Sequence, residues 1–156
     1  MEFCHIMPTD FLEKYAGKYN SHLMLAHLVE SDGRYADWFE AYDGAKILDN
    51  SAFEMYKQKK PMYPTEKLLK MGERVKADYI VMSDYPDQVG EVTISAAKEI
   101  APVFKEAGFG TFFCPQSKIG DLEDLVDSFS WAANSPLVDY IGFSILNIPN
   151  AYGVEK

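Results

Sequence analysis

At 156 residues the chain has the length of one domain, and its 47% hydrophobic and 25% charged residues are ordinary for a globular protein. The net charge of −9 argues against a protein that mainly binds nucleic acid non-specifically, because phosphate contacts require a basic face. No apolar run approaches the roughly 18–20 residues that cross a bilayer. The N-terminus also lacks the basic and apolar regions of a signal peptide, so we expect a cytoplasmic protein.

Five short apolar segments recur along the chain. Each is too short for a helix and is rich in β-branched, aromatic or leucine residues, as buried strands are. The predicted strands are Leu23–Leu28, Ala45–Leu48, Tyr79–Met82, Thr111–Phe113 and Val138–Phe143.

Helical patterns alternate with these strands. A short helix is predicted over Asp10–Tyr15, and an i, i+3, i+4, i+7 spacing predicts one apolar helix face. That face consists of Tyr35, Trp38, Phe39 and Tyr42. Thr65, Thr93 and Asp121 can each cap a later helix, because their side-chain oxygens accept a hydrogen bond from the first turn. On the last of these helices we expect Leu122, Leu125, Val126 and Phe129 to face inward.

Every predicted strand stops at or next to a hydrogen-bonding side chain. These are His27, Asp49, Asp84, Gln116 and, after the fifth strand, Ser144 and Asn147. In a barrel the strand ends form a shared rim, whereas a doubly wound sheet binds ligands at one switch point. The pattern therefore favours a barrel, although a complete one needs about 250 residues.

We therefore predict a single α/β domain over residues 1–156, with repeated βα units, parallel strands and a helical lead-in over residues 1–20. The favoured architecture is a partial TIM (β/α)8 barrel of about five units. A doubly wound five-stranded open sheet is the alternative, and the length of the chain alone favours it.

Three of the strand ends have side chains suited to binding a flat heterocycle. Asp49 follows its strand directly, so its carboxylate is held rigidly, but Asp-Asn-Ser is also ordinary turn chemistry. Asp84 and Asp87 flank a proline-stiffened loop, where they could accept N–H groups of a base or cap the next segment. Gln116 offers a donor and an acceptor to an amide-like edge.

Other kinds of site have little support. The two cysteines, Cys4 and Cys114, are too few for a disulfide scaffold, and Cys114 has no adjacent charge to lower its pKa as a nucleophile needs. The three histidines lack metal-ligand spacing, and no glycine-rich phosphate loop follows a strand. We expect no metal and no cofactor. The basic segment Lys57–Lys60 is interpreted as a solvated loop, with local contacts to a polyanion left open.

Four segments, in this order, resemble the tRNA-guanine transglycosylase family, including its phage and bacterial relatives that insert 7-deazaguanines into nucleic acid. Ile47–Glu54 resembles that family's strand ending in Asp-Ser-Gly-Gly-Phe-Gln, and Ser83–Asp87 resembles its base-reading Asp segment. Phe113–Gln116 resembles the Val-Gln-Gly stretch, and Asp139–Ser144 the Gly-rich strand end. The resemblance spans most of the chain, from about residue 23 to 145.

The resemblance implies base exchange. A carboxylate attacks the ribose C1′ of a flipped-out guanosine, and guanine or a 7-deazaguanine is exchanged in tRNA or DNA. Asp49 would be the acid/base carboxylate, and Asp84 or Asp87 would bind the base edge. The remaining base-binding positions that it implies are Gln116, the backbone at Gly142, Phe53 and Ser51.

The chain also departs from the family pattern. Ser51-Ala52 replaces a glycine pair, and Glu54 replaces a glutamine. The family's nucleophilic Asp and its zinc-binding cysteines belong to later segments, so we expect this chain to lack the nucleophile. An open barrel would expose apolar strand edges, which predicts self-association or a partner that completes the barrel. A non-catalytic binding or assembly module and an unrelated open-sheet α/β enzyme remain alternatives.

Overall fold

Five parallel strands form one sheet in the computed structural model, which describes residues 4–144 and 147–153. The strands are β1 (Ser21–Leu25), β2 (Ala45–Asp49), β3 (Tyr79–Val81), β4 (Gly110–Phe113) and β5 (Tyr140–Ile141). Their order in the sheet is their order in the sequence, and each neighbouring pair is parallel. The predicted α/β class is confirmed. A doubly wound sheet reverses direction at a switch point, which this sheet lacks within the described residues.

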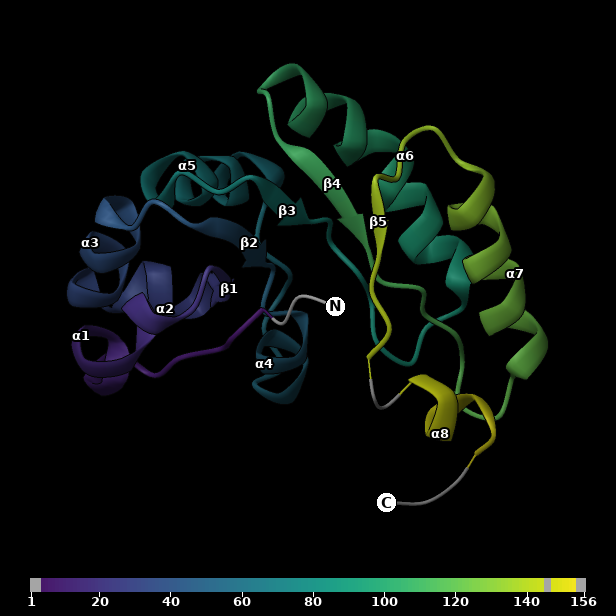
Figure 1. The fold of residues 1–156 in the computed structure, drawn as a ribbon. Helices are drawn as coiled ribbons and strands as arrows, with labels where there is room; N and C mark the ends of the chain where they lie inside the picture. Colours follow the sequence, from purple (N-terminus) through teal and green to yellow (C-terminus); the bar gives the residue numbers. More distant parts are fainter. Residues whose placement is uncertain (1–3, 145–146, 154–156) are drawn as a thin grey trace.

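Helices alternate with the strands and form an outer arc around them (Figure 1). The N-terminal turns are η1 (Thr9–Phe11), α1 (Leu12–Tyr15) and η2 (Ala16–Lys18). The later helices are α2 (Ala26–Ser31), α3 (Gly33–Ala41), α4 (Ala52–Lys57), α5 (Thr65–Val75), α6 (Gly90–Glu106), α7 (Leu122–Asn134) and α8 (Asn147–Ala151). Within the described ranges, no helix combines the length and the apolar character that a membrane span needs.

The core lies between the sheet and the outer helices. Successive side chains of a strand point to opposite faces, so residues paired in register share a face. Met24, Leu48 and Ile80 are paired in this way and are fully buried beneath the helices. Phe39 of α3 and Phe104 of α6 are also fully buried in the same apolar cluster. The opposite face of the strands is only partly buried at residues 23, 47 and 79.

Three helix starts test the predicted caps. Asp121 does cap α7, since its carboxylate accepts a hydrogen bond from the backbone N–H of Asp124 at 3.0 Å. Thr65 makes no side-chain cap and is instead the first residue of α5. Thr93 lies inside α6, where its hydroxyl accepts from the backbone N–H of Tyr85. Helix α6 begins earlier, at Gly90. The backbone N–H of Gly90 at this helix start donates to the carboxylate of Asp124.

The predicted inward face of α7 is largely wrong. Leu125 is buried, but Leu122, Val126 and Phe129 are each at least 36% exposed. The reason is that α7 lies beside β5, the last strand of the described sheet, so only one side of this helix is covered.

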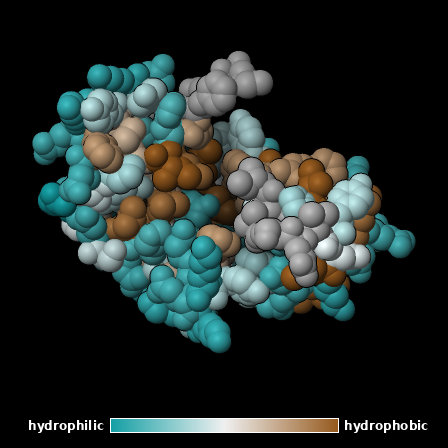
Figure 2. Space-filling view, turned by 90° about the horizontal axis from the view of Figure 1, so that it is seen from below, coloured by the Kyte–Doolittle hydropathy of each residue, from teal (hydrophilic) through white to brown (hydrophobic). Residues whose placement is uncertain are grey.

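Figure 2 shows the molecule from below. Apolar residues gather near the centre of the surface seen in that view, with hydrophilic residues around them.

Candidate functional site

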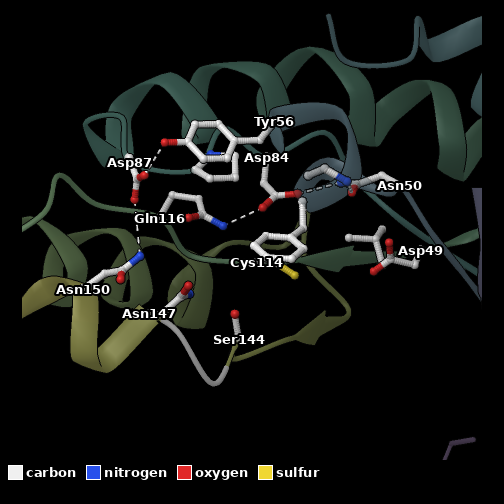
Figure 3. A pocket seen from close by; sticks show the side chains of 14 residues that line it. Asp49, Asn50, Tyr56, Asp84, Asp87, Cys114, Gln116, Ser144, Asn147 and Asn150 are labelled. Atoms are coloured by element: carbon white, nitrogen blue, oxygen red, sulfur yellow. Dashed lines mark hydrogen bonds between the residues drawn. The ribbon is translucent and has the colours of Figure 1, made fainter. Parts of the chain in front are cut away.

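A cavity of about 170 Å³ lies at the carboxyl ends of β2, β3 and β4 (Figure 3). Its walls are formed by Asp49, Asn50, Ala52, Phe53, Tyr56, Val81, Asp84, Pro86, Asp87, Cys114, Gln116, Ser144, Asn147 and Asn150. Five predicted site residues are therefore brought together, namely Asp49, Phe53, Asp84, Asp87 and Gln116. They come from three strand ends that are far apart in the sequence, because parallel strands all end at the same edge of a sheet.

Two predicted site residues do not line this cavity. Ser51 is fully buried, and its hydroxyl contacts the backbone N–H of His27 at 3.1 Å and the ring Nδ1 of His27 at 2.9 Å. Gly142 donates its N–H to the carbonyl of Phe113. A Cβ on Gly142 would lie 2.4 Å from the ring of Phe112, so this glycine permits close packing on β4.

Asp84 occupies the middle of a hydrogen-bonded row of polar side chains. Asn50 Nδ2 donates to Asp84 Oδ1 at 2.7 Å, and Gln116 Nε2 donates to Asp84 Oδ2 at 2.5 Å. Burial raises the pKa of Asp84 from 3.8 to about 7, and the charge of Asp49 acts in the same direction. The two hydrogen bonds oppose this shift because they favour the ionised form. At neutral pH both protonation states of the Asp84 carboxyl group are therefore populated.

Asp49 is the second carboxyl group of the cavity. It ends β2 and accepts a hydrogen bond from the backbone N–H of Ser51 at 2.6 Å. Burial, and to a smaller extent the charge of Glu54, raise the pKa of Asp49 from 3.8 to about 6, although the hydrogen bond from Ser51 acts in the opposite direction. Carboxyl groups with strongly raised pKa values in a shared cleft are typical of functional sites, where they can take up and release protons near neutral pH.

A third acid, Asp87, joins two helices across the rim of the cavity. The hydroxyl of Tyr56 in α4 donates to Asp87 Oδ2 at 2.6 Å, and Asn150 Nδ2 in α8 donates to Asp87 Oδ1 at 3.3 Å. Figure 3 shows this bridge at the opposite end of the cavity from Asp49. Both carboxylate oxygens of Asp87 thus accept a hydrogen bond from a side chain, whereas the hydrogen bond described for Asp49 comes from the backbone N–H of Ser51.

Sequence reasoning gave no site role to three residues of the cavity, Asn50, Tyr56 and Asn150. For Tyr56 a signal was present, because residues three apart on a helix share a face and Phe53 was already a candidate. Asn150 lies at the cavity because α8 packs beside it, and no helical spacing in the sequence predicted α8.

The thiol of Cys114 also faces the cavity. Burial raises the pKa of this thiol well above its ordinary value, and the charges of Asp84 and Asp49 add to the effect. The thiol is therefore uncharged at neutral pH. Across residues 4–144 and 147–153, no three His, Cys, Asp or Glu side chains are grouped so as to hold a metal ion.

Comparisons with known proteins bear on the fold. No family model matches the chain, and no curated protein sequence matches it. Among solved structures, the carboxyl transferase domain of Rhizobium etli pyruvate carboxylase, solved with pyruvate, superposes with a TM-score of 0.50 at 17% identity. The match covers 85% of this chain and 23% of that one, so the chain spans about a quarter of that protein's length. At this identity the likeness shows a TIM-barrel-like fold and nothing about activity.

Proposed function

We propose that the cavity binds guanine or a 7-deazaguanine, and that the chain is the base-binding part of a transglycosylase that exchanges guanine in tRNA or DNA. The observation that supports this most is the convergence of Asp49, Asp84 and Gln116 on one cavity, with Asp84 and Gln116 in direct contact. These are the positions at which the resemblance to the tRNA-guanine transglycosylases implies base binding and acid/base chemistry.

The polar groups of the cavity complement the edge of a guanine-type base. Such an edge has N–H donors and a carbonyl acceptor side by side. The carboxylate of Asp84 can accept from the donors, and the amide of Gln116 can both donate and accept. A site built in this way rejects bases without the donors, because its buried polar groups would then be left unpaired.

The size and the walls of the cavity suit a base rather than a whole nucleotide. An apolar cavity of about 150 Å³ holds a benzene ring, and the present one is about 170 Å³ and open to solvent. The rings of Phe53 and Tyr56 line it, and stacking on an aromatic ring stabilises a bound base by about 1–3 kcal/mol. The sugar would remain outside, as it does when an enzyme flips a nucleotide out of its stack.

In the proposed exchange a carboxylate forms a bond to C1′ as the bond from C1′ to guanine N9 breaks. The leaving guanine takes up a proton, and the incoming base gives one up as it displaces the carboxylate. The raised pKa of Asp49, about 6, suits a group that moves these protons near neutral pH. The attacking carboxylate is expected from segments that complete the barrel, as the resemblance implies.

The basic segment after α4 supports a polyanionic substrate. Lys57, Lys59 and Lys60 are exposed, although the chain as a whole is acidic. Lys57 Nζ lies 4.3 Å from the ring centroid of Phe53, which lines the cavity. Lys57, beside the cavity, can neutralise a phosphate of a strand whose base has entered the cavity, and we propose that Lys59 and Lys60 extend this basic segment along the strand.

A non-catalytic binding or assembly module is the second candidate, and exposed apolar side chains around β5 favour it. Tyr140 and Phe143 are each 52% exposed, and Phe143 packs against the exposed ring of Phe129. We propose that a second copy of this chain covers this edge. Sedimentation tests this idea: the chain should self-associate, and Phe143→Ser should weaken the association. A monomer at high concentration would contradict self-association.

Calorimetry with guanine, 7-deazaguanine and adenine tests the proposed function. Guanine and 7-deazaguanine should bind with measurable heat and raise the melting temperature, whereas adenine should not. Asp84→Asn and Gln116→Ala should abolish the heat, and Asp127→Asn, which changes an exposed acid on α7, should leave it unchanged. If no purine produces heat or a thermal shift with the wild-type chain, the proposed function is wrong.

A further inference from the structure

The side chain of Asn50, in the cavity wall, is fully hydrogen-bonded within the protein. It is 1% exposed and lies one residue after β2. Its Nδ2 donates to the carbonyl of Met82 at 2.6 Å and to Asp84 Oδ1 at 2.7 Å. Its Oδ1 accepts from the backbone N–H of Ala52 at 2.8 Å. Both of its N–H donors are therefore used within the protein, so Asn50 has none left for a ligand.

The partners of Asn50 determine which way its amide group points. The carbonyl of Met82 can only accept, so the end of the amide that faces it must be the NH₂ group. The N–H of Ala52 can only donate, so the other end must be the oxygen. A flipped amide would place oxygen against oxygen and NH₂ against N–H. The same NH₂ group therefore always presents a donor to Asp84.

This donor acts on one oxygen of Asp84, while Gln116 acts on the other. Two donors in fixed positions define the plane and the rotation of a carboxylate group. Gln116 is itself a predicted ligand-binding side chain and can turn when a ligand arrives. Asn50 is held by two backbone groups, so it is the fixed reference of the pair.

We propose that Asn50 is a positioning residue for Asp84: it fixes the orientation of the carboxylate and thereby decides which hydrogen-bond donors of a ligand the cavity accepts. The part of this inference that concerns ligand choice rests on the proposed base-binding function. The part that concerns Asp84 does not, and it can be measured in the ligand-free protein.

The first readout is the titration of the Asp84 side chain, followed by ¹³C NMR in the absence of any base, with Asp84→Asn used to assign the signal. The hydrogen bond from Asn50 lowers the pKa of Asp84, so Asn50→Ala should raise the titration midpoint. A hydrogen bond to a charged group is typically strong enough for a shift of about one to two pH units. Asn134→Ala, which removes an exposed asparagine of α7, should leave the midpoint unchanged.

The second readout is the pH dependence of guanine affinity. Binding should require ionised Asp84, so the loss of affinity in Asn50→Ala should be largest at about pH 6 and below. For an upward shift of about one pH unit, the loss should shrink by roughly sevenfold by about pH 8.5, where Asp84 is largely ionised in both proteins. A merely structural role would lower stability and give a loss of affinity that does not change with pH.

Asn50→Val provides a second variant, should Asn50→Ala fail to fold. Valine fills more of the space of the asparagine side chain and has no group that can donate to Asp84, so the same upward shift of the midpoint is expected. An unshifted midpoint in a folded variant would overturn the proposal. A shifted midpoint together with no purine binding by the wild-type chain would support the positioning role and refute the base-binding function instead.

Discussion

Replacing Asp84 by asparagine should stabilise the protein at alkaline pH. The pKa of Asp84 rises from 3.8 to about 7 on folding because the carboxyl group is buried. The folded state therefore binds a proton more tightly than the unfolded state, and stability decreases as the pH rises from about 4 to about 7. A rise of about three pH units corresponds to roughly 4 kcal/mol, since each unit contributes about 1.4 kcal/mol.

Asparagine has nearly the same shape and cannot ionise, so Asp84→Asn should remove this loss. One of the two donors around residue 84 then faces an NH₂ group, which reduces the gain unless the amide of Gln116 turns over. We expect Asp84→Asn to be more stable than the wild-type chain by about 2–4 kcal/mol at about pH 8, and to lose this advantage towards pH 4.

Urea unfolding of both proteins at a series of pH values measures this difference. Other carboxyl groups titrate in both proteins, so the difference between the two free energies of unfolding isolates Asp84. A variant that is equally stable, or less stable, at about pH 8 would refute the reasoning. A buried carboxylate that lowers the stability of the fold is a common feature of functional sites.

Two further perturbations test the surroundings of the cavity. Gly90→Ala would place a Cβ 2.9 Å from the backbone oxygen of Gln116. We therefore expect the free energy of unfolding, measured with urea, to fall by about 1–3 kcal/mol, and guanine to bind more weakly. Gly33→Ala is the matched control, because a Cβ at Gly33 meets nothing within 4 Å. The double change Lys59→Glu and Lys60→Glu should weaken binding of a single-stranded oligonucleotide and flatten its salt dependence, measured by fluorescence anisotropy, while guanine affinity stays constant. Equal salt slopes for the variant and the wild-type chain would contradict a phosphate-binding role.

Parts of the fold that depend on local patterns were predictable from the sequence. The strands around Ala45–Leu48 and Thr111–Phe113 are short apolar runs between polar turns, and they are strands in the structure. The strand predicted over Leu23–Leu28 is β1, Ser21–Leu25, in the structure, because the end of the apolar run belongs to α2. Its true start includes His22, a polar residue that is buried because its ring nitrogens contact the carbonyls of His5 and Ala16. Such tertiary partners leave no periodic signal.

The candidate site also has a part that the sequence predicts and a part that it does not. Asp49, Asp84 and Gln116 could be predicted as neighbours because parallel strands end at one edge of a sheet, so three strand ends imply one shared rim. The role of Asn50 could not be predicted, because it depends on how the chain turns after β2 and on the carbonyl of Met82, in the loop that follows β3. Neither the path of the backbone in that turn nor the rotamer of the Asn50 side chain follows from a local sequence pattern.

The central claim, that Asp84 and Gln116 together contact a guanine-type base, is tested most directly by following their side chains during a guanine titration of the wild-type chain. We predict that the Gln116 side-chain amide signals and the Asp84 carboxyl ¹³C signal shift together and saturate with one dissociation constant, while the side-chain amide of exposed Asn134 stays unchanged. Saturable binding that leaves both the Gln116 and the Asp84 signals in place, or the absence of any saturable shift, would contradict the claim.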